Sequence, residues 1–234
     1  FGPVNYSFNI GNAHVVTIKS INYRGGCHYE EEITDEDLRW LERDLSYVPK
    51  DRLVILNMHA PGWNAMEPID NILNAKRLEE ILAPYDAHVF AGHTHFFENV
   101  EVSPRLYQHN IGSACGAWWT SNICRAGSPN GYMVVTVDGK KLRWKYRSAN
   151  SKSDVQMRVY KPGEFRTQKD FIVAIVWEWD PHCRLLWYED GKYKGLMQRF
   201  VDNDEAFLRT TPRKHQLATP GHLFRARTST KKYR

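Results

Sequence analysis

The sequence predicts an α/β domain followed by a small all-β domain of the sandwich type. Two apolar runs at 53–56 and 87–91 indicate buried strands, and the segment 69–82 between them carries apolar residues near helical spacing. Strand, helix and strand in that order form a crossover unit with parallel strands. Further along the chain the pattern changes to short strands separated by turn residues. We therefore expect one domain at 1–150 and a second at 151–234.

The first domain shows additional elements on either side of the crossover unit. Loose alternation over 8–20 predicts a strand. A helix is expected to begin after Thr34, which nearly forms a capping box with Asp37. A hairpin turn is expected at Asp138-Gly139. Short β-like runs follow the second buried strand at 96–102, 105–111, 131–137 and 141–147.

The second domain is expected to begin after the polar segment 148–154, which has no apolar periodicity and suits a linker. Trp177 and Trp179 share one face of an expected strand, and Trp187 lies on the next. These tryptophans form either a surface that stacks on sugars or bases or the core of a small sheet. The expected strands are 156–160, 170–180, 184–188 and 193–200.

Three histidines follow the two buried strands. His93 and His95 come directly after Gly92, and in an extended chain positions i and i+2 face the same side. His59 follows the neighbouring strand, and the carboxyl ends of parallel strands meet at one edge of a sheet. We therefore expect His59, His93 and His95 to converge and to bind a transition metal. The alternative for the His-x-His pair alone is two hydrogen-bonded loop histidines.

The order of these motifs resembles a known family. A strand, His59 and a proline, then a helix, a strand and the run Gly92-His93-Thr94-His95 resemble the second half of the calcineurin-like metallophosphoesterases. Residues 6–18 resemble the strand that follows this family's Gly-Asn-His motif. Residues 115–119 and 129–132 resemble a bacterial subgroup that carries an extra C-terminal β-domain.

The resemblance implies a fold, a reaction and cofactors. The fold would be the second half of an αββα sandwich with an added β-domain. The reaction would be hydrolysis of phosphate mono- or diesters by two divalent metal ions (Mn, Fe or Zn). His59 and His93 would ligate one ion and His95 the other. The resemblance also favours a periplasmic or extracellular compartment.

The first half of the family pattern is not found in the sequence. Neither a Gly-Asp-x-x-Asp nor a Gly-Asn-His motif occurs in it, and residue 1 is phenylalanine rather than methionine. We therefore expect the catalytic residues upstream of Phe1, in an N-terminal half that partners this chain. Three histidines divided between two metals are too few ligands. The chain alone is accordingly expected to supply only part of the centre and to be inactive.

Six further residues are candidates for substrate binding. Three of them flank His59, two lie in a loop rich in small residues, and one precedes that loop within reach of a phosphate. They are Asn57, Trp63, Asn64, Trp118, Trp119 and His109. The alternative function is a non-catalytic module whose aromatic, basic β-domain binds a glycan, nucleic acid or an anionic surface.

Charge and composition limit the other classes of function that the sequence could serve. Residues 1–150 hold 15 Lys+Arg against 17 Asp+Glu, whereas residues 151–234 hold 17 against 10, a net charge of +7 that concentrates near the end. A solvated basic face is the favoured interpretation over nucleic-acid binding. No run of eighteen apolar residues exists to span a membrane. The cysteines form no Cys-x-x-Cys pair, and a Cys115–Cys124 disulfide is left open.

Overall fold

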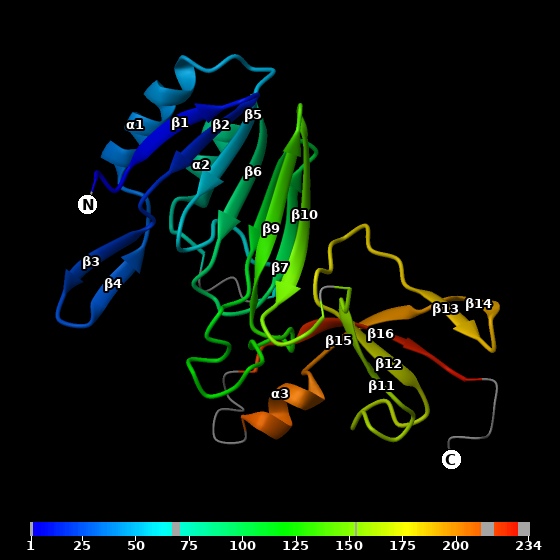
Figure 1. Cartoon of the computed structure of the whole chain (residues 1–234). Helices are drawn as coiled ribbons and strands as arrows, with labels where there is room; N and C mark the ends of the chain where they lie inside the picture. The colour runs from blue at the N-terminus through cyan, green and yellow to red at the C-terminus, as the bar shows by residue number, and fades with distance from the viewer. Residues whose placement is uncertain (1, 67–70, 153, 212–217, 229–234) are drawn as a thin grey trace. The chain divides into compact units, whose positions relative to one another are not determined.

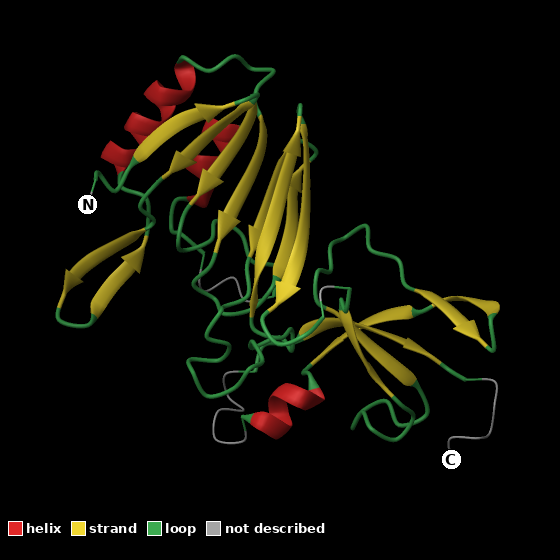
Figure 2. Cartoon of the chain, in the orientation of Figure 1, coloured by secondary structure: helices red, strands yellow, loops and turns green. Residues whose placement is uncertain are grey.

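The computed structural model describes residues 2–66, 71–152, 154–211 and 218–228 (Figure 1). Strands predominate over helices (Figure 2). The chain divides into two compact units that interleave in sequence. The first unit contains 1–94, 98–111 and 133–145, and the second contains 95–97, 112–132 and 146–234. The expected domain boundary near residue 150 stays a prediction, but the segment 112–132 groups with the second unit rather than the first.

The first unit is built on a six-stranded sheet in the order β1-β2-β5-β6-β8-β7. The predicted parallel crossover is confirmed, because β5 and β6 run parallel with Ile55 opposite His88. The single strand predicted at 8–20 is wrong. Gly11, with φ of 54°, turns the chain into an antiparallel hairpin instead. The strands are β1 (Tyr6–Ile10), β2 (Ala13–Thr17), β5 (Leu53–Asn57), β6 (Asp86–Ala91), β7 (Glu98–Ser103) and β8 (Leu106–Asn110).

Two helices, α1 (Asp35–Ser46) and α2 (Ala75–Leu82), cover one face of this sheet (Figures 1 and 2). The predicted cap of α1 is confirmed, since the Thr34 hydroxyl accepts a hydrogen bond from the backbone N–H of Asp37 at 3.1 Å. Helix α2 is shorter than the segment predicted for it, and residues 67–70 lie outside the described chain. The core between helices and sheet includes Leu41, Leu45, Leu56, Leu78, Leu82 and Val89, all almost fully buried.

The opposite face of the sheet carries a hairpin of β9 (Gly131–Asp138) and β10 (Lys141–Ser148). Trp144 of β10 packs on His109 of β8 with ring centroids 4.5 Å apart. His109 in turn stacks on His88 and shares a hydrogen bond of 2.9 Å with it, while its Nδ1 lies 2.6 Å from the amide oxygen of Asn99. Within the described residues of this unit, helices cover one face of the sheet, so a complete αββα sandwich is not observed.

This histidine pair links the stability of the first unit to pH. Burial lowers the pKa of His88 from 6.5 to about 4 and the pKa of His109 to about 2. Both imidazoles are neutral in the folded state, whereas the unfolded chain binds protons near pH 6.5. The stabilisation is therefore complete above pH 6.5 and declines as pH falls towards 4, by up to about 1.4 kcal/mol per pH unit for each histidine. Urea unfolding at a series of pH values measures this slope.

The variant His109→Phe is expected to flatten the slope between pH 6.5 and 5, because it removes one titrating group. At pH 7 the same variant is expected to be less stable than wild type, since the hydrogen bond between His109 and Asn99 is lost. His28→Ala, at an exposed histidine, serves as the control. An unchanged slope in His109→Phe would show that the buried pair does not link proton binding to folding.

The second unit contains an antiparallel sheet in the order β11-β12-β16-β15 and a two-stranded hairpin of β13 and β14. Its strands match the predicted runs, except that 193–200 forms two strands and that α3 and β16 were not predicted. The elements are β11 (Met157–Tyr160), β12 (Ile172–Val176), β13 (Leu186–Glu189), β14 (Lys192–Leu196), β15 (Gln198–Asp202), α3 (Glu205–Thr210) and β16 (Gly221–Ala226).

The structure decides between the alternatives that the sequence left for the tryptophans and cysteines of this unit. Trp177 and Trp179 are buried and Trp187 is half-buried, so the core interpretation is confirmed.

Cys115 and Cys124 are both free thiols, and burial raises the pKa of Cys124 to about 12. In the part of the chain that the structure describes, no helix has the length and apolarity needed to cross a membrane.

Candidate functional site

His59 lies two residues beyond the end of β5, with its side chain exposed at the carboxyl edge of the sheet. Two contacts fix its backbone. Its N–H donates to the hydroxyl of Ser20 at 3.0 Å, and its carbonyl accepts from the N–H of Gly92 at 2.9 Å. Ser20 itself is almost fully buried. The second contact ties the loop after β5 to the loop after β6.

His93 faces His59 across this edge. The Nδ1 atom of His93 lies 3.1 Å from the Nε2 atom of His59, so the structure brings these two predicted ligands together. The expectation of an extended His-x-His segment is wrong, however. His93 and His95 both have left-handed backbones, with φ of 66° and 56°. Such a conformation is strained for a histidine and is typical of functional sites.

Glu31 orients the His93 ring from the other side. Its Oε1 atom lies 3.3 Å from Nε2 of His93, and the ring of Tyr29 meets the same imidazole edge-on at 5.9 Å. Both residues belong to the hairpin of β3 (Ile21–Gly25) and β4 (His28–Glu31). Metal-ligating histidines commonly donate their second N–H to a carboxylate, which fixes the tautomer. Glu31 could not be predicted as a site residue, because nothing in its local pattern distinguishes it from Glu30 or Glu32.

His95 belongs to the second unit and has its own set of neighbours there. Its Nδ1 atom lies 3.0 Å from the carbonyl oxygen of Gly116, and its ring stacks on Trp118 at 4.5 Å. If Nδ1 donates its proton to that carbonyl, Nε2 is the unprotonated nitrogen of the ring. Gly116 has φ of 61°, and a Cβ there would lie 2.1 Å from the carbonyl oxygen of Ser121. Only glycine fits this position, which was also not predicted as part of the site.

The nitrogens of His59 and His93 are placed as two ligands of one metal ion would be. Metal–nitrogen bonds of about 2.0–2.1 Å place two nitrogens on one ion roughly 2.9–3.4 Å apart, and the His59–His93 separation of 3.1 Å falls in this range. Yet among the described residues no three His, Cys, Asp or Glu side chains are grouped closely enough to hold an ion. These residues therefore fit as a pair of ligands and not as a complete centre.

Three of the weaker candidates flank His59. Asn57 ends β5 with a half-buried side chain. Trp63 packs against the core, and its carbonyl accepts hydrogen bonds from Gln108 and Asn110. Asn64 is buried and its side-chain oxygen accepts from Asn110, while its Nδ2 atom has no acceptor among the described residues. Asn64 therefore has a buried donor that no described residue satisfies.

The other three candidates are placed very differently from one another. Trp118 stacks on His95 and is 38% exposed, so it lies beside a predicted ligand. Trp119 is 87% exposed and points to solvent. His109 is fully buried as the second-last residue of β8, in contact with His88 and Asn99. Its contact with a phosphate stays a prediction.

Comparison with known proteins identifies a family for more than half of the chain. The family described as the C terminal of calcineurin-like phosphoesterase matches residues 108–233. No curated protein matches the chain. The matched region contains Trp118, Trp119 and the β-domain, whereas His59, His93 and His95 lie before it.

Proposed function

Because the chain belongs to the calcineurin-like phosphoesterase family, we propose that it serves the metal-dependent hydrolysis of phosphate mono- or diesters. The observation that carries this proposal is the pair of imidazole nitrogens of His59 and His93, 3.1 Å apart at the carboxyl edge of a parallel sheet. The carboxylate of Glu31 behind His93 and the strained backbone of the His-x-His turn support it.

In this proposal each histidine has a defined role. His59 and His93 bind one divalent ion, and His95 binds a second. Glu31 holds the proton on Nε2 of His93, and the Gly116 carbonyl holds the proton on Nδ1 of His95. Each contact leaves the opposite nitrogen of the ring as the metal ligand. Two bound ions of Mn, Fe or Zn would supply a nucleophilic hydroxide and neutralise charge on the phosphoryl oxygens. The remaining ligands would come from residues outside this sequence.

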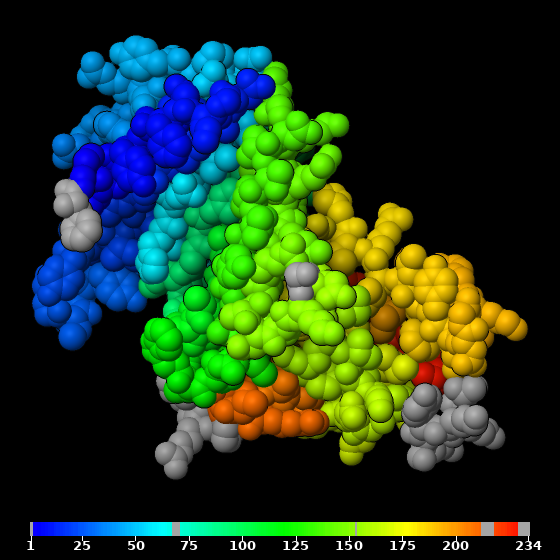
Figure 3. All heavy atoms as spheres, in the orientation of Figure 1, coloured from blue at the N-terminus to red at the C-terminus, as the bar shows by residue number. Residues whose placement is uncertain are grey.

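We also propose that the first unit is the second half of an αββα sandwich. Apolar side chains of β1 are exposed on the face away from the helices, where Tyr6 stacks on Phe8 and Ile10 is 64% exposed. The surface of this strand can be followed in Figure 3, where it is dark blue. Valines 134, 135 and 137 of β9 are exposed as well. A second sheet would cover such apolar strands.

A non-catalytic binding module is the second candidate function. It predicts an exposed aromatic surface on the β-domain, but Trp177 and Trp179 are buried in that domain. We therefore place phosphoester hydrolysis first.

The proposed function is tested by turnover on para-nitrophenyl phosphate and its bis-ester with added manganese. A protein that contains this chain together with the remaining metal ligands is expected to be active. The 234-residue chain alone is expected to be inactive, because it supplies too few ligands. His95→Ala in the active protein is expected to lower turnover by orders of magnitude, since the second ion loses a ligand.

Two further variants make this experiment specific. His95→Asn tolerates the left-handed backbone better than alanine does, so it separates loss of the imidazole from strain in the turn. His182→Ala, at an exposed histidine of the second unit, is the control and is expected to be fully active. Wild-type turnover in both His95 variants would contradict the proposed role of His95.

A further inference from the structure

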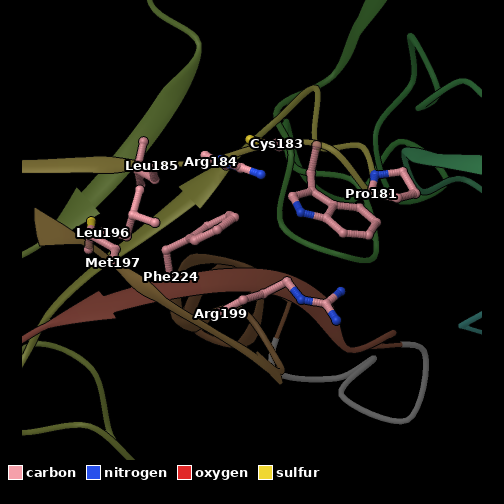
Figure 4. Close-up of a pocket in the computed structure, with 9 residues that line it drawn as sticks. Pro181, Cys183, Arg184, Leu185, Leu196, Met197, Arg199 and Phe224 are labelled. Atoms are coloured by element: carbon pink, nitrogen blue, oxygen red, sulfur yellow. The ribbon is translucent and has the colours of Figure 1, made fainter.

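The second unit contains a pocket of about 270 Å³ in the β-domain. Its lining combines buried apolar side chains with two arginines. Trp179, Met197 and Phe224 form an almost fully buried floor, whereas Arg184 and Arg199 are exposed. In Figure 4 the ring of Phe224 is seen between the two arginines, which extend from different segments of the chain. The pocket is thus apolar at its base and cationic at its rim.

The positive charge of the two arginines is not neutralised within the described chain. Arg184 has no hydrogen-bond or carboxylate partner there. Arg199 lies over the ring of Trp179 at 5.1 Å and contacts the Nδ1 atom of His222 at 3.2 Å, and neither partner is an anion. Most other arginines of the β-domain are engaged. Arg158, for example, pairs with Asp204 at 3.1 Å.

Asp180 and Glu178, the carboxylates that act on the pocket thiol Cys183, do not neutralise the two arginines. Burial, together with Asp180 and Glu178, raises the pKa of the pocket thiol Cys183, so this thiol is neutral near pH 7. Asp180 accepts a hydrogen bond from the backbone N–H of His182, and Glu178 accepts one from the backbone N–H of Tyr146. Neither carboxylate forms an ion pair with Arg184 or Arg199 within the described residues.

We propose that this pocket binds a small organic oxyanion, with a carboxylate or phosphate on an apolar, flat body. Arg184 and Arg199 would contact the charged oxygens, because guanidinium groups match the geometry of carboxylates and phosphates. The body would lie on Phe224 and Met197, which offer an apolar and aromatic surface. The volume suits a ligand of one ring and one charged group rather than an oligomer.

Cys183 provides a local readout of binding, because it lines the pocket and is a partly exposed free thiol. The experiment measures its rate of alkylation by iodoacetamide in the 234-residue chain, by mass spectrometry of the peptide that contains it. The probes are phenyl phosphate, benzoate, inorganic phosphate and phenol. Cys27 is exposed on another part of the chain and serves as the internal control. Phenyl phosphate or benzoate is expected to slow alkylation of Cys183 and not of Cys27.

Phenyl phosphate and benzoate show whether the pocket prefers a phosphate or a carboxylate, and protection by either one supports the proposal. Inorganic phosphate and phenol are each expected to need about tenfold more probe for half-protection, because each lacks one half of the interaction. The proposal would be overturned if inorganic phosphate or phenol protected Cys183 at the same concentration as the aromatic anions. It would also be overturned if neither phenyl phosphate nor benzoate protected Cys183 at millimolar concentrations.

Arginine variants complete the test. Arg184→Ala and Arg199→Ala are each expected to raise the half-protecting concentration by about tenfold, as loss of a charge-assisted hydrogen bond does. Both side chains are exposed, so the fold is expected to be retained, and circular dichroism checks this. Arg143→Ala, at an exposed arginine of β10, is the matched control. Unchanged protection in both pocket variants would overturn the proposal.

Discussion

Replacing His93 by alanine is expected to abolish metal-dependent phosphoester turnover while a milder change at Glu31 only weakens it. His93 offers Nδ1 to the proposed ion beside Nε2 of His59, so its removal deletes a direct ligand. Glu31→Gln keeps a hydrogen-bond acceptor for Nε2 of His93 but removes the negative charge that raises the basicity of the ring. Loss of such an outer partner costs roughly 10- to 100-fold in metal affinity or activity, and loss of the ligand should exceed this.

The measurement combines turnover of the active protein that contains the remaining metal ligands with calorimetric titration of manganese and zinc. His28→Ala is a matched control, because His28 is an exposed histidine on the same hairpin as Glu31. His93→Asn accompanies His93→Ala, since the residue has φ of 66° and asparagine tolerates that conformation. Equal metal affinity in wild type, His93→Ala and Glu31→Gln would refute the site. An effect of Glu31→Gln equal to that of His93→Ala would make the carboxylate a ligand itself.

The strand–helix–strand frame of this site could be predicted from the sequence. The strands β5 and β6 are mostly apolar and largely buried, and α2 shows its buried stripe through Leu78 and Ile81. The positions of His59 and His93 at the strand ends follow from this frame.

The local geometry could not be predicted, because it depends on contacts between distant segments. Glu31 meets His93 across 62 residues of sequence, and Ser20 positions the backbone of His59 across 39. No short-range signal encodes such pairs. The left-handed backbone at His93 and His95 is equally hidden, since only a few per cent of non-glycine residues adopt positive φ, even though histidine is enriched among them.

The association of the segment 112–132 with the β-domain was missed for a similar reason. Its anchors are single polar residues far along the chain. Arg158 donates to the carbonyl of Gly127 at 3.0 Å and to Asp204 at 3.1 Å. Gly127 has φ of 97°, and a Cβ there would lie 2.3 Å from Asp204. The same segment reaches His95, because the N–H of Arg125 donates to its carbonyl at 2.9 Å.

Asp204 is the centre of this anchor. Its side chain is fully buried, it accepts from the Tyr160 hydroxyl at 2.6 Å, and it caps α3 by accepting from the N–H of Phe207 at 2.9 Å. Burial raises the pKa of Asp204, because a charged carboxylate loses its hydration there. That loss is offset by Arg158 and by the hydrogen bonds. Removal of the carboxyl group therefore leaves several buried polar partners unsatisfied.

Asp204→Ala is expected to destabilise the second unit by about 3–5 kcal/mol, the cost of breaking a buried, hydrogen-bonded ion pair. Asp204→Asn should cost clearly less, because asparagine keeps the helix cap and an acceptor without burying a charge. Urea unfolding followed by tryptophan fluorescence measures both, with the exposed Asp170→Ala as control. Since the anchor also holds the segment that contacts His95, Asp204→Ala should lower phosphoester turnover although no atom of Asp204 contacts His95 directly. If the free energy of unfolding fell by less than about 1 kcal/mol in Asp204→Ala, the buried network would contribute no more than a typical surface ion pair. Other contacts would then hold the segment 112–132 in place.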